Sequence, residues 1–433
     1  MKPYLMAQVK LSELAKVGVI GMVGTAIEDF DFIAAGLISN IAWPFVFFPK
    51  ANFVAALLAS VGAFLVSFAA RPFGAFLFGH FGDRLGRKST LVMTLLTMGV
   101  GVAIIAFLPG YAVLGLISPV LLFVARILQG LGYGGEWGSV TTWVVEHASQ
   151  SKWRALWASL VPEGYAIGGV AAAVLVTSLL SAYGFKSFVA FYWRVPFYAG
   201  IAVIVLGAIL RYSLMESPIF SKILTERRAL SLPALQVLRE KLGDVIKLAG
   251  VNMIAQTPFY VAITVMITYI STVLGLPRSF ASFTTVIGEI VGGGLVIAFG
   301  LLGDLVGRRT TLIGTYVVTA IFSIPYILLI NTASPALVIL GQVILMGLAF
   351  GAVAVLSSFL SEYFEPKYRA SGSGLAYQIG VLLGVLPQSL IIAYLIGMGK
   401  AGSIYIGLVL TVTAILSLLS ILLSRETKGS SVS

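Results

Sequence analysis

The 433-residue chain has no cysteine, only two histidines, and charged side chains at only 10% of its positions. Without cysteine it has no disulfide bond and no thiol chemistry. The sequence shows no cluster of metal ligands, no Walker-type phosphate loop and no Ser-His-Asp arrangement, so we expect no metal, no cofactor and no enzymatic activity. A soluble globular chain carries about 25% charged residues. The composition therefore excludes a soluble enzyme, intrinsic disorder and a nucleic-acid-binding protein.

Apolar side chains make up 59% of the chain instead, and the mean hydropathy is +1.01. A bilayer core about 30 Å thick needs roughly 20 apolar residues per helix. Twelve stretches meet this requirement and predict an all-α membrane protein. The predicted spans are approximately 15–43, 53–81, 89–108, 114–146, 155–182, 190–212, 247–274, 281–303, 310–330, 335–362, 371–397 and 402–424.

The formal charge of +11 comes from basic residues that gather in short loops between the apolar runs. The N-terminus and every second loop hold most of them, whereas the opposite loops hold few. Because basic loops remain in the cytoplasm, we expect a multi-pass protein of the cell membrane with both termini cytoplasmic. The protein is then embedded in the lipid bilayer. An even number of spans agrees with this topology, because it places both termini on the same side of the membrane.

A ten-residue segment after the second span recurs after the eighth. Five of its positions match at a constant offset of 221: Gly79/Gly300, Gly82/Gly303, Asp83/Asp304, Gly86/Gly307 and Arg87/Arg308. Internal repeats of this kind are typical of transporters. They predict two pseudo-symmetric six-helix bundles, at 1–213 and 247–433, joined by a cytoplasmic linker at 214–246.

A second repeated pattern follows spans four and ten. Glu146 lies eight residues before Arg154, and Glu362 lies seven residues before Arg369. Its offset is close to that of the first repeat, which supports the division into two halves.

The first repeated segment, Gly-x3-Asp-Arg-x-Gly-Arg-Lys at 79–88, resembles the signature loop of the major facilitator superfamily. Four other segments resemble its metabolite:proton symporter branch: 28–32, 71–74, 126–138 and 193–197. That branch includes carriers of proline and betaine, of citrate and 2-oxoglutarate, and of shikimate. The resemblance covers nearly the whole chain. It implies the major facilitator fold and transport by alternating access, and it is a poor guide to the substrate.

The repeated loops also predict a conformational latch. A carboxylate at a helix end accepts hydrogen bonds from the free N–H groups of a helix start and pairs with arginine. Such a cluster forms only when neighbouring helices approach, so we expect it to hold the outward-facing state, as the resemblance also implies. The alternative is a set of static loop ion pairs worth little energy. The predicted latch residues are Asp83, Arg84, Arg87, Glu146, Arg154, Asp304, Arg308, Glu362 and Arg369.

Ionisable residues at membrane depth are costly and are candidates for function. Asp31 lies 18 residues beyond Glu13 in the first span, and Arg126 lies 20 residues before Glu146 in the fourth. At 1.5 Å per residue both are about 27–30 Å from the cytoplasmic ends. By resemblance, these positions match the proton-coupling Asp–Arg pair of sugar/proton symporters. Separation of the pair would link protonation to conformation, whereas a permanent salt bridge is the alternative.

Three further acids lie deep in the first half. Glu28, on the same helical face as Asp31, is a second proton site or a substrate contact. Glu136 lies in a glycine-rich stretch, where helix packing, a proton relay and substrate contact are all open. Glu163 is a candidate substrate contact, because the proline and betaine carriers have an acid there and many organic-acid carriers have glutamine; a protonated structural carboxyl is the alternative.

Asp29 faces away from Asp31 and has no assigned role, and Arg71 has no assigned partner beyond Glu28 or Glu136. The first half then holds five deep acids against two arginines. Such a cavity suits a zwitterion, a cation, or a monoanion bound with protonated carboxyls. Glu289, in the second half, is expected to pair within that half.

The second half offers neutral polar groups. Asn252, Gln256 and Tyr260 are spaced four residues apart on one helical face, and Tyr377 and Gln378 lie on span eleven. Neutral donors and acceptors on a cavity wall orient a ligand, although hydrogen bonding between helices is the alternative.

These features predict a proton-coupled symporter that imports a small organic metabolite, such as a carboxylate or a zwitterion. Its partners are the solute and protons, without nucleic acid, and we expect a monomer. A uniporter or a drug/proton antiporter of the same fold is the alternative, followed by a polytopic membrane sensor or enzyme.

Overall fold

The computed structural model describes residues 11–212, 215–225 and 232–431. Each predicted span coincides with a long helix, and no strand occurs among the described residues. The long helices are α1 (Leu11–Ile41), α3 (Phe53–Leu85), α4 (Arg87–Phe107), α6 (Ile117–His147), α7 (Arg154–Ala190), α8 (Val195–Tyr212), α11 (Leu242–Tyr260), α13 (Arg278–Val306), α14 (Arg308–Asn331), α15 (Pro335–Tyr363), α16 (Arg369–Gly397) and α17 (Lys400–Leu422).

Short elements connect or extend these helices. α11 continues through η2 (Val261–Val265), α12 (Met266–Thr268) and η3 (Tyr269–Val273), so that the whole forms one span. The others are α2 (Trp43–Phe47), α5 (Tyr111–Leu114), η1 (Tyr192–Arg194), α9 (Pro218–Thr225), α10 (Pro233–Glu240) and η4 (Pro366–Tyr368). In the described part of the chain, ten helical segments are long and apolar enough to cross a membrane. α1 and α16 are not among the ten; α1 is 31 residues long and carries five charged side chains.

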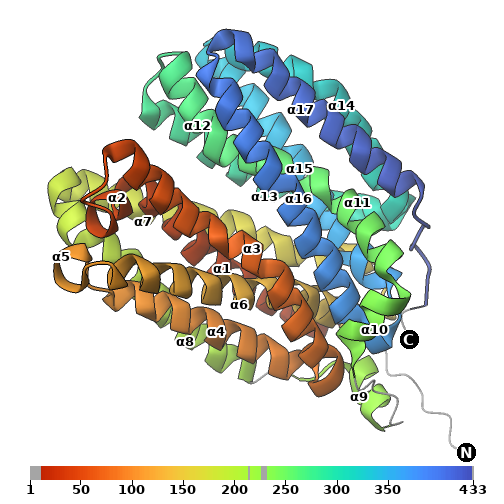
Figure 1. Ribbon diagram of the computed structural model, residues 1–433. Coiled ribbons are helices and arrows are strands. Elements are labelled where there is room, and N and C mark those ends of the chain that lie inside the picture. The colour runs from red at the N-terminus through yellow and green to blue at the C-terminus, as the bar shows by residue number, and fades with distance from the viewer. Residues whose placement is uncertain (1–10, 213–214, 226–231, 432–433) are drawn as a thin grey trace, which may run out of the picture.

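The helices pack mainly with others of their own half. α1 packs on α7 and α3 on α6 in the N-terminal half, whereas α13 packs on α15 and α11 on α16 in the C-terminal half. Figure 1 shows the two groups, coloured red to yellow-green and green to blue, side by side. The halves meet through α7 with α13 and α15, and through α16 with α3 and α6.

The helices α9 and α10 lie at one end of the molecule (Figure 1), which we call the linker end. They belong to the predicted linker at 214–246, of which residues 214 and 226–231 lie outside the described residues. α10 contacts α3 and α16, and α9 contacts α6 and η4. The repeated loops therefore lie at this end of both halves.

Each repeated loop contains a glycine with positive φ immediately before the next helix. Gly86, between α3 and α4, has φ 112°, and Gly307, between α13 and α14, has φ 114°. Residues with a Cβ rarely adopt this region. The two matched glycines of the repeat thus allow the same sharp turn in both halves.

Candidate functional site

A central cavity lies between the two halves, roughly midway along the helices. Its wall includes Asp29 and Arg71 from the N-terminal half and Gln256, Tyr260 and Tyr377 from the C-terminal half. Tyr133, Tyr165, Ala255, Phe259, Ala349, Phe350 and Val353 complete it. The wall is mostly apolar, with a few convergent polar groups, as is typical of small-molecule sites.

A second cavity, which we call the side cavity, is formed by the N-terminal half alone. Glu28, Asp31 and Arg126 line it, with Phe32, Ser67, Met98, Gln129 and Gly130. Arg71 and Tyr133 line both cavities, so the two adjoin.

The predicted pair Asp31 and Arg126 lies in the side cavity, joined through a third residue. Gln129 donates from Nε2 to Asp31 Oδ2 at 2.6 Å, and its Oε1 accepts from Arg126 at 2.5 Å. Arg126 also donates to Ser67 Oγ at 3.0 Å. Gln129, on the next turn of α6 after Arg126, was missed by the sequence analysis. Two hydrogen bonds through Gln129 thus connect the acid to the base.

Asp29 and Arg71 occupy the wall of the central cavity, where the sequence analysis gave neither a role. The Arg71 guanidinium stacks on Phe32, Phe68 and Tyr133 at 3.9–4.4 Å from the ring centroids. Its Nε and one terminal nitrogen have no hydrogen-bond partner among the described residues, nor does Asp29 Oδ2. A buried carboxylate and a buried guanidinium thus offer unused hydrogen-bonding atoms beside one cavity.

The predicted neutral wall is partly on the cavity and partly behind it. Gln256, Tyr260 and Tyr377 line the cavity, and Gln256 donates to the Tyr377 hydroxyl at 3.1 Å. Asn252 lies behind them, donating to the Tyr377 carbonyl at 2.7 Å. Gln378 turns to the other half and donates to the Tyr133 carbonyl at 3.5 Å. Asn252 and Gln378 therefore support the wall from positions outside the cavity lining.

Tyr377 is fixed by contacts with the N-terminal half. Its ring stacks on Trp137 with centroids 3.7 Å apart, and its hydroxyl lies 3.2 Å from that of Tyr165. A movement of the halves must therefore displace this side chain.

Glu136 and Glu28 belong to a buried cluster in the N-terminal half. Arg211, at the end of α8, forms an ion pair with Glu136 and donates to the Leu91 carbonyl at 2.8 Å. Thr94 donates to Glu136 Oε2 at 2.9 Å, and Glu28 lies close enough to Glu136 to interact with it electrostatically. Glu136 lines neither cavity, so its position favours a structural or proton-binding role over substrate contact. Arg211 corrects the count of deep arginines from two to three.

Glu163 and Glu289 both lie where α7 meets α13. Glu163 is half-buried, and its Oε2 has no hydrogen-bond partner among the described residues. Glu163 Oε1 lies 3.2 Å from the position that a Cβ of Gly293 would take, and the residue lines neither described cavity. Glu289 faces Gly169 and Asp29 in the other half. The expectation that Glu289 pairs within its own half is wrong.

The first motif cluster, formed by Asp83, Arg87, Glu146 and Arg369, bridges the halves at the linker end. Asp83 accepts from the N–H groups of Ala370 and Ser371, at the start of α16, at 3.0 and 2.8 Å. Arg87 pairs with Asp83 at 2.7 Å and with Glu146 at 3.1 Å, and Arg369 pairs with Glu146 at 3.2 Å. Arg84 is exposed and lies outside this cluster, unlike its predicted neighbours.

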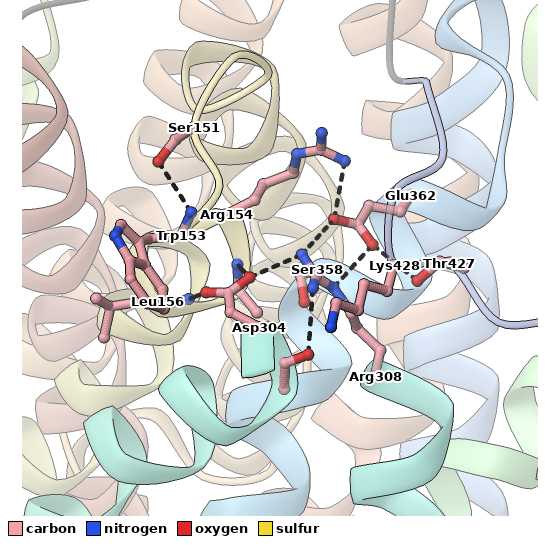
Figure 2. A network of polar contacts seen from close by, with 12 residues as sticks. Ser151, Trp153, Arg154, Leu156, Asp304, Arg308, Ser358, Glu362, Thr427 and Lys428 are labelled. Atoms are coloured by element: carbon pink, nitrogen blue, oxygen red, sulfur yellow. Dashed lines mark hydrogen bonds and ion pairs between the residues drawn. The ribbon is translucent and has the colours of Figure 1, made fainter. Parts of the chain in front are cut away.

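The second motif cluster, formed by Asp304, Arg308, Glu362 and Arg154, repeats this arrangement (Figure 2). Asp304 accepts from the N–H groups of Ala155 and Leu156, at the start of α7, at 3.0 and 2.8 Å. Arg308 and Arg154 both pair with Glu362 at 3.1 Å. Each half thus inserts an aspartate at the start of a helix in the other half.

Two glutamates that the sequence analysis missed cap the helices after the repeated loops. Glu216 accepts from the N–H groups of Arg87 and Lys88 at 3.0 and 3.2 Å, and Glu426 accepts from those of Arg308 and Arg309 at 3.0 and 3.1 Å. The next residue in each case donates to a motif glutamate: Ser217 to Glu146, and Thr427 to Glu362 at 2.7 Å. A Glu-Ser or Glu-Thr pair after the sixth and twelfth spans was the available signal.

The family model described as the Major Facilitator Superfamily matches residues 31–387. The chain belongs to this superfamily. It is a multi-pass membrane transporter rather than an enzyme, as the duplicated motif clusters and the cavity between the halves also indicate.

Several curated relatives cover most of the chain. It is 35% identical to the inner membrane metabolite transport protein YhjE of Escherichia coli, over 96% of this chain and 95% of that protein. It is 30% identical to the shikimate transporter of Escherichia coli over 86% of each chain, and 28% identical to a proline/betaine transporter of Salmonella typhimurium, over 90% of this chain and 80% of that one.

The solved structures confirm the fold. The proton:xylose symporter XylE, bound to 6-bromo-6-deoxy-D-glucose, superposes with a TM-score of 0.74 and 17% identity, covering 97% of this chain and 98% of that one. The predicted all-helical major facilitator fold is therefore correct.

Proposed function

We propose that this transporter is a proton-coupled symporter that imports a small organic metabolite, a carboxylate or a zwitterion, by alternating access. The observation that carries the proposal is the Asp31–Gln129–Arg126 chain in a cavity that adjoins the central one. A buried carboxylate is costly unless it is paired or protonated. Because Gln129 shares its amide between acid and base, loss of the proton at Asp31 changes the contacts of Arg126.

The balance of buried charge supports proton binding. Six carboxyls lie deep in the described helices (Glu28, Asp29, Asp31, Glu136, Glu163 and Glu289), against three arginines (Arg71, Arg126 and Arg211). Unpaired charges in a low-dielectric interior are unfavourable. Protonation of the excess carboxyls removes this cost. A proton-coupled transporter requires a carboxyl that can bind and release a proton in this way.

The central cavity supports the solute class. The free guanidinium nitrogens of Arg71 suit a carboxylate, and Asp29 beside them suits a positive group. The printed names of two relatives, a shikimate transporter and a proline/betaine transporter, agree with a carboxylate or a zwitterion.

The linker end is the cytoplasmic end in this proposal, because the basic loops gather there. Both termini are then cytoplasmic in the cell membrane, and the closed motif clusters correspond to an outward-facing state. The proposal keeps the expectation of a monomer.

A thermal-shift screen of carboxylates, amino acids, betaines and aromatic acids identifies a solute, and uptake of that solute into proteoliposomes tests the mechanism. Acidification outside should drive accumulation in the wild type. Asp31→Asn should lose accumulation and keep solute exchange, whereas Asp244→Asn, at a half-buried surface ion pair with Lys247, should retain both. Accumulation by the Asp31 variant rejects the coupling role. Uptake without accumulation in the wild type indicates a uniporter, and efflux driven by the gradient indicates an antiporter.

A further inference from the structure

Two carboxyls from opposite halves converge on one glycine of α7. Glu289 Oε2, on α13, lies 3.2 Å from the position that a Cβ of Gly169 would take, and Asp29 Oδ2, on α1, lies 3.4 Å from the same position. The separation of these oxygens cannot exceed the two distances combined. Because glycine has no side chain, α7 leaves room there for both carboxyls.

Both carboxyls are removed from water. Asp29 is 3% exposed and Glu289 is 4% exposed. Asp29 Oδ2, the oxygen that faces Gly169, has no hydrogen-bond partner among the described residues. An unpaired carboxylate oxygen in such a place is unfavourable, and a proton held between the two groups would satisfy it.

The surrounding groups leave an excess of negative charge. Arg71, from α3, acts on Asp29 electrostatically, and so do the hydroxyl groups of Tyr133, from α6, and Tyr260, from α11. On the α7 side the ionisable neighbours are Glu163, which approaches Gly293 one turn from Glu289, and Tyr165. Among the described residues, Arg71 thus acts on Asp29, and no basic side chain is recorded beside Glu289 or Glu163.

We propose that Asp29, on α1, and Glu289, on α13, bind one proton as a coupled pair beside Gly169 of α7, and that this proton favours the arrangement with a closed linker end. The contacts of α7 with α13 run from Gly169 to Ala155, which donates to Asp304. Opening the linker end separates the helices along this line. Two deprotonated carboxyls repel each other at the interface, whereas a shared proton joins them.

The inference rests on the proposed coupling to protons, but it concerns a site distinct from Asp31. The absence of native cysteine allows spin labels at Ser187→Cys and Ser279→Cys. These exposed residues lie on α7 and α13 at the end opposite the linker. Pulsed EPR distances in nanodiscs between pH 5.5 and 8.5 then give the ratio of linker-closed to linker-open molecules at each pH, a range of about three units around neutrality.

Acidification should raise this ratio in the wild type by up to about tenfold per pH unit for each coupled proton. Glu289→Gln and Asp29→Asn should each reduce the pH dependence of this ratio by the contribution of about one coupled proton, which is up to about tenfold per pH unit. Thr285→Val, one turn from Glu289 and hydrogen-bonded to the Ala281 carbonyl of its own helix, is the matched control and should respond like the wild type.

The outcomes separate this site from the general mechanism. If Asp31→Asn reduces the response while both Glu289→Gln and Asp29→Asn respond like the wild type, the shared site is refuted and the proposed symport stands. If the wild type has no pH response and no proton-driven uptake, both fail. A reduced response in either site variant, with an unchanged Thr285→Val, supports the inference.

Discussion

The contact of Asp83 with the start of α16 allows the energy of linker-end closure to be measured. Asp83 accepts two backbone N–H groups of the opposite half, at 3.0 and 2.8 Å, and also pairs with Arg87 at 2.7 Å. Asp83→Asn removes the charge and one acceptor oxygen while keeping the shape. A hydrogen bond to a charged group contributes about 1.5–3 kcal/mol, and a neutral one about 1 kcal/mol.

The expected loss is therefore at least about 2 kcal/mol in the closed state, because one charged bond is lost and the other becomes neutral. If the proposed opening of the linker end breaks these inter-half bonds, the ratio of closed to open molecules should fall about 30-fold or more. The spin-label pair at Ser187 and Ser279 reports this ratio directly. Asp244→Asn is the matched control, because it makes the same chemical change at the linker end without contacting the other half.

An unchanged distance distribution in a folded Asp83→Asn protein would refute the reasoning. It would mean that Arg87, Glu146 and Arg369 hold the halves together without the aspartate, or that the cluster is a static feature of both states. A shift equal to that of Asp244→Asn would lead to the same conclusion.

Gly138→Ala should favour the open linker end about tenfold or more, measured with the same labels, because its Cβ would lie 2.6 Å from the Ala370 carbonyl oxygen across the halves. Arg211→Gln should lower the free energy of unfolding by about 3–5 kcal/mol in thermal or denaturant unfolding, because it leaves buried Glu136 without its ion-pair partner. The double variant with Glu136→Gln should show a smaller decrease in this free energy. Burial alone would raise the pKa of Glu426, but four backbone N–H groups hold it below its ordinary value. Its stabilisation is therefore present at neutral pH and lost in acid, and Glu426→Gln should lower the melting temperature by about 2 °C at pH 7, with a smaller difference near pH 4.

The spans and the motif clusters were predictable because they depend on local or repeated signals. Hydropathy determines which stretches cross the bilayer, and the constant offset of 221 aligns Asp83 with Asp304 and Arg87 with Arg308. Both aspartates do reach a helix start in the opposite half. Arg84 is exposed, unlike the neighbouring motif residues. The sequence alone did not show that Arg84 lies outside the cluster.

The deep site was only partly predictable, because α1 lies between two cavities. Asp31 and Asp29 are two residues apart and so lie about 200° apart around the helix. A single cavity would leave one of them without a role, but Asp31 lines the side cavity and Asp29 the central one. Arg211 lies at the edge of its span, and its partner Glu136 is 75 residues away in sequence. Because these residues are so far apart in the sequence, no helical periodicity indicates that they form a pair.

The crossed arrangement of the motif clusters explains why closure can be cooperative. Asp83 of the N-terminal half holds the start of α16, and Asp304 of the C-terminal half holds the start of α7. Each helix start is also bordered by an arginine, Arg369 or Arg154, that pairs with a glutamate of the opposite half. In the proposed alternating-access mechanism, a rigid movement of the halves breaks both clusters together, so their energies act on one equilibrium. In the proposed mechanism, a proton or a solute bound at the middle of the molecule opposes or assists that sum only through its different affinity for the two states.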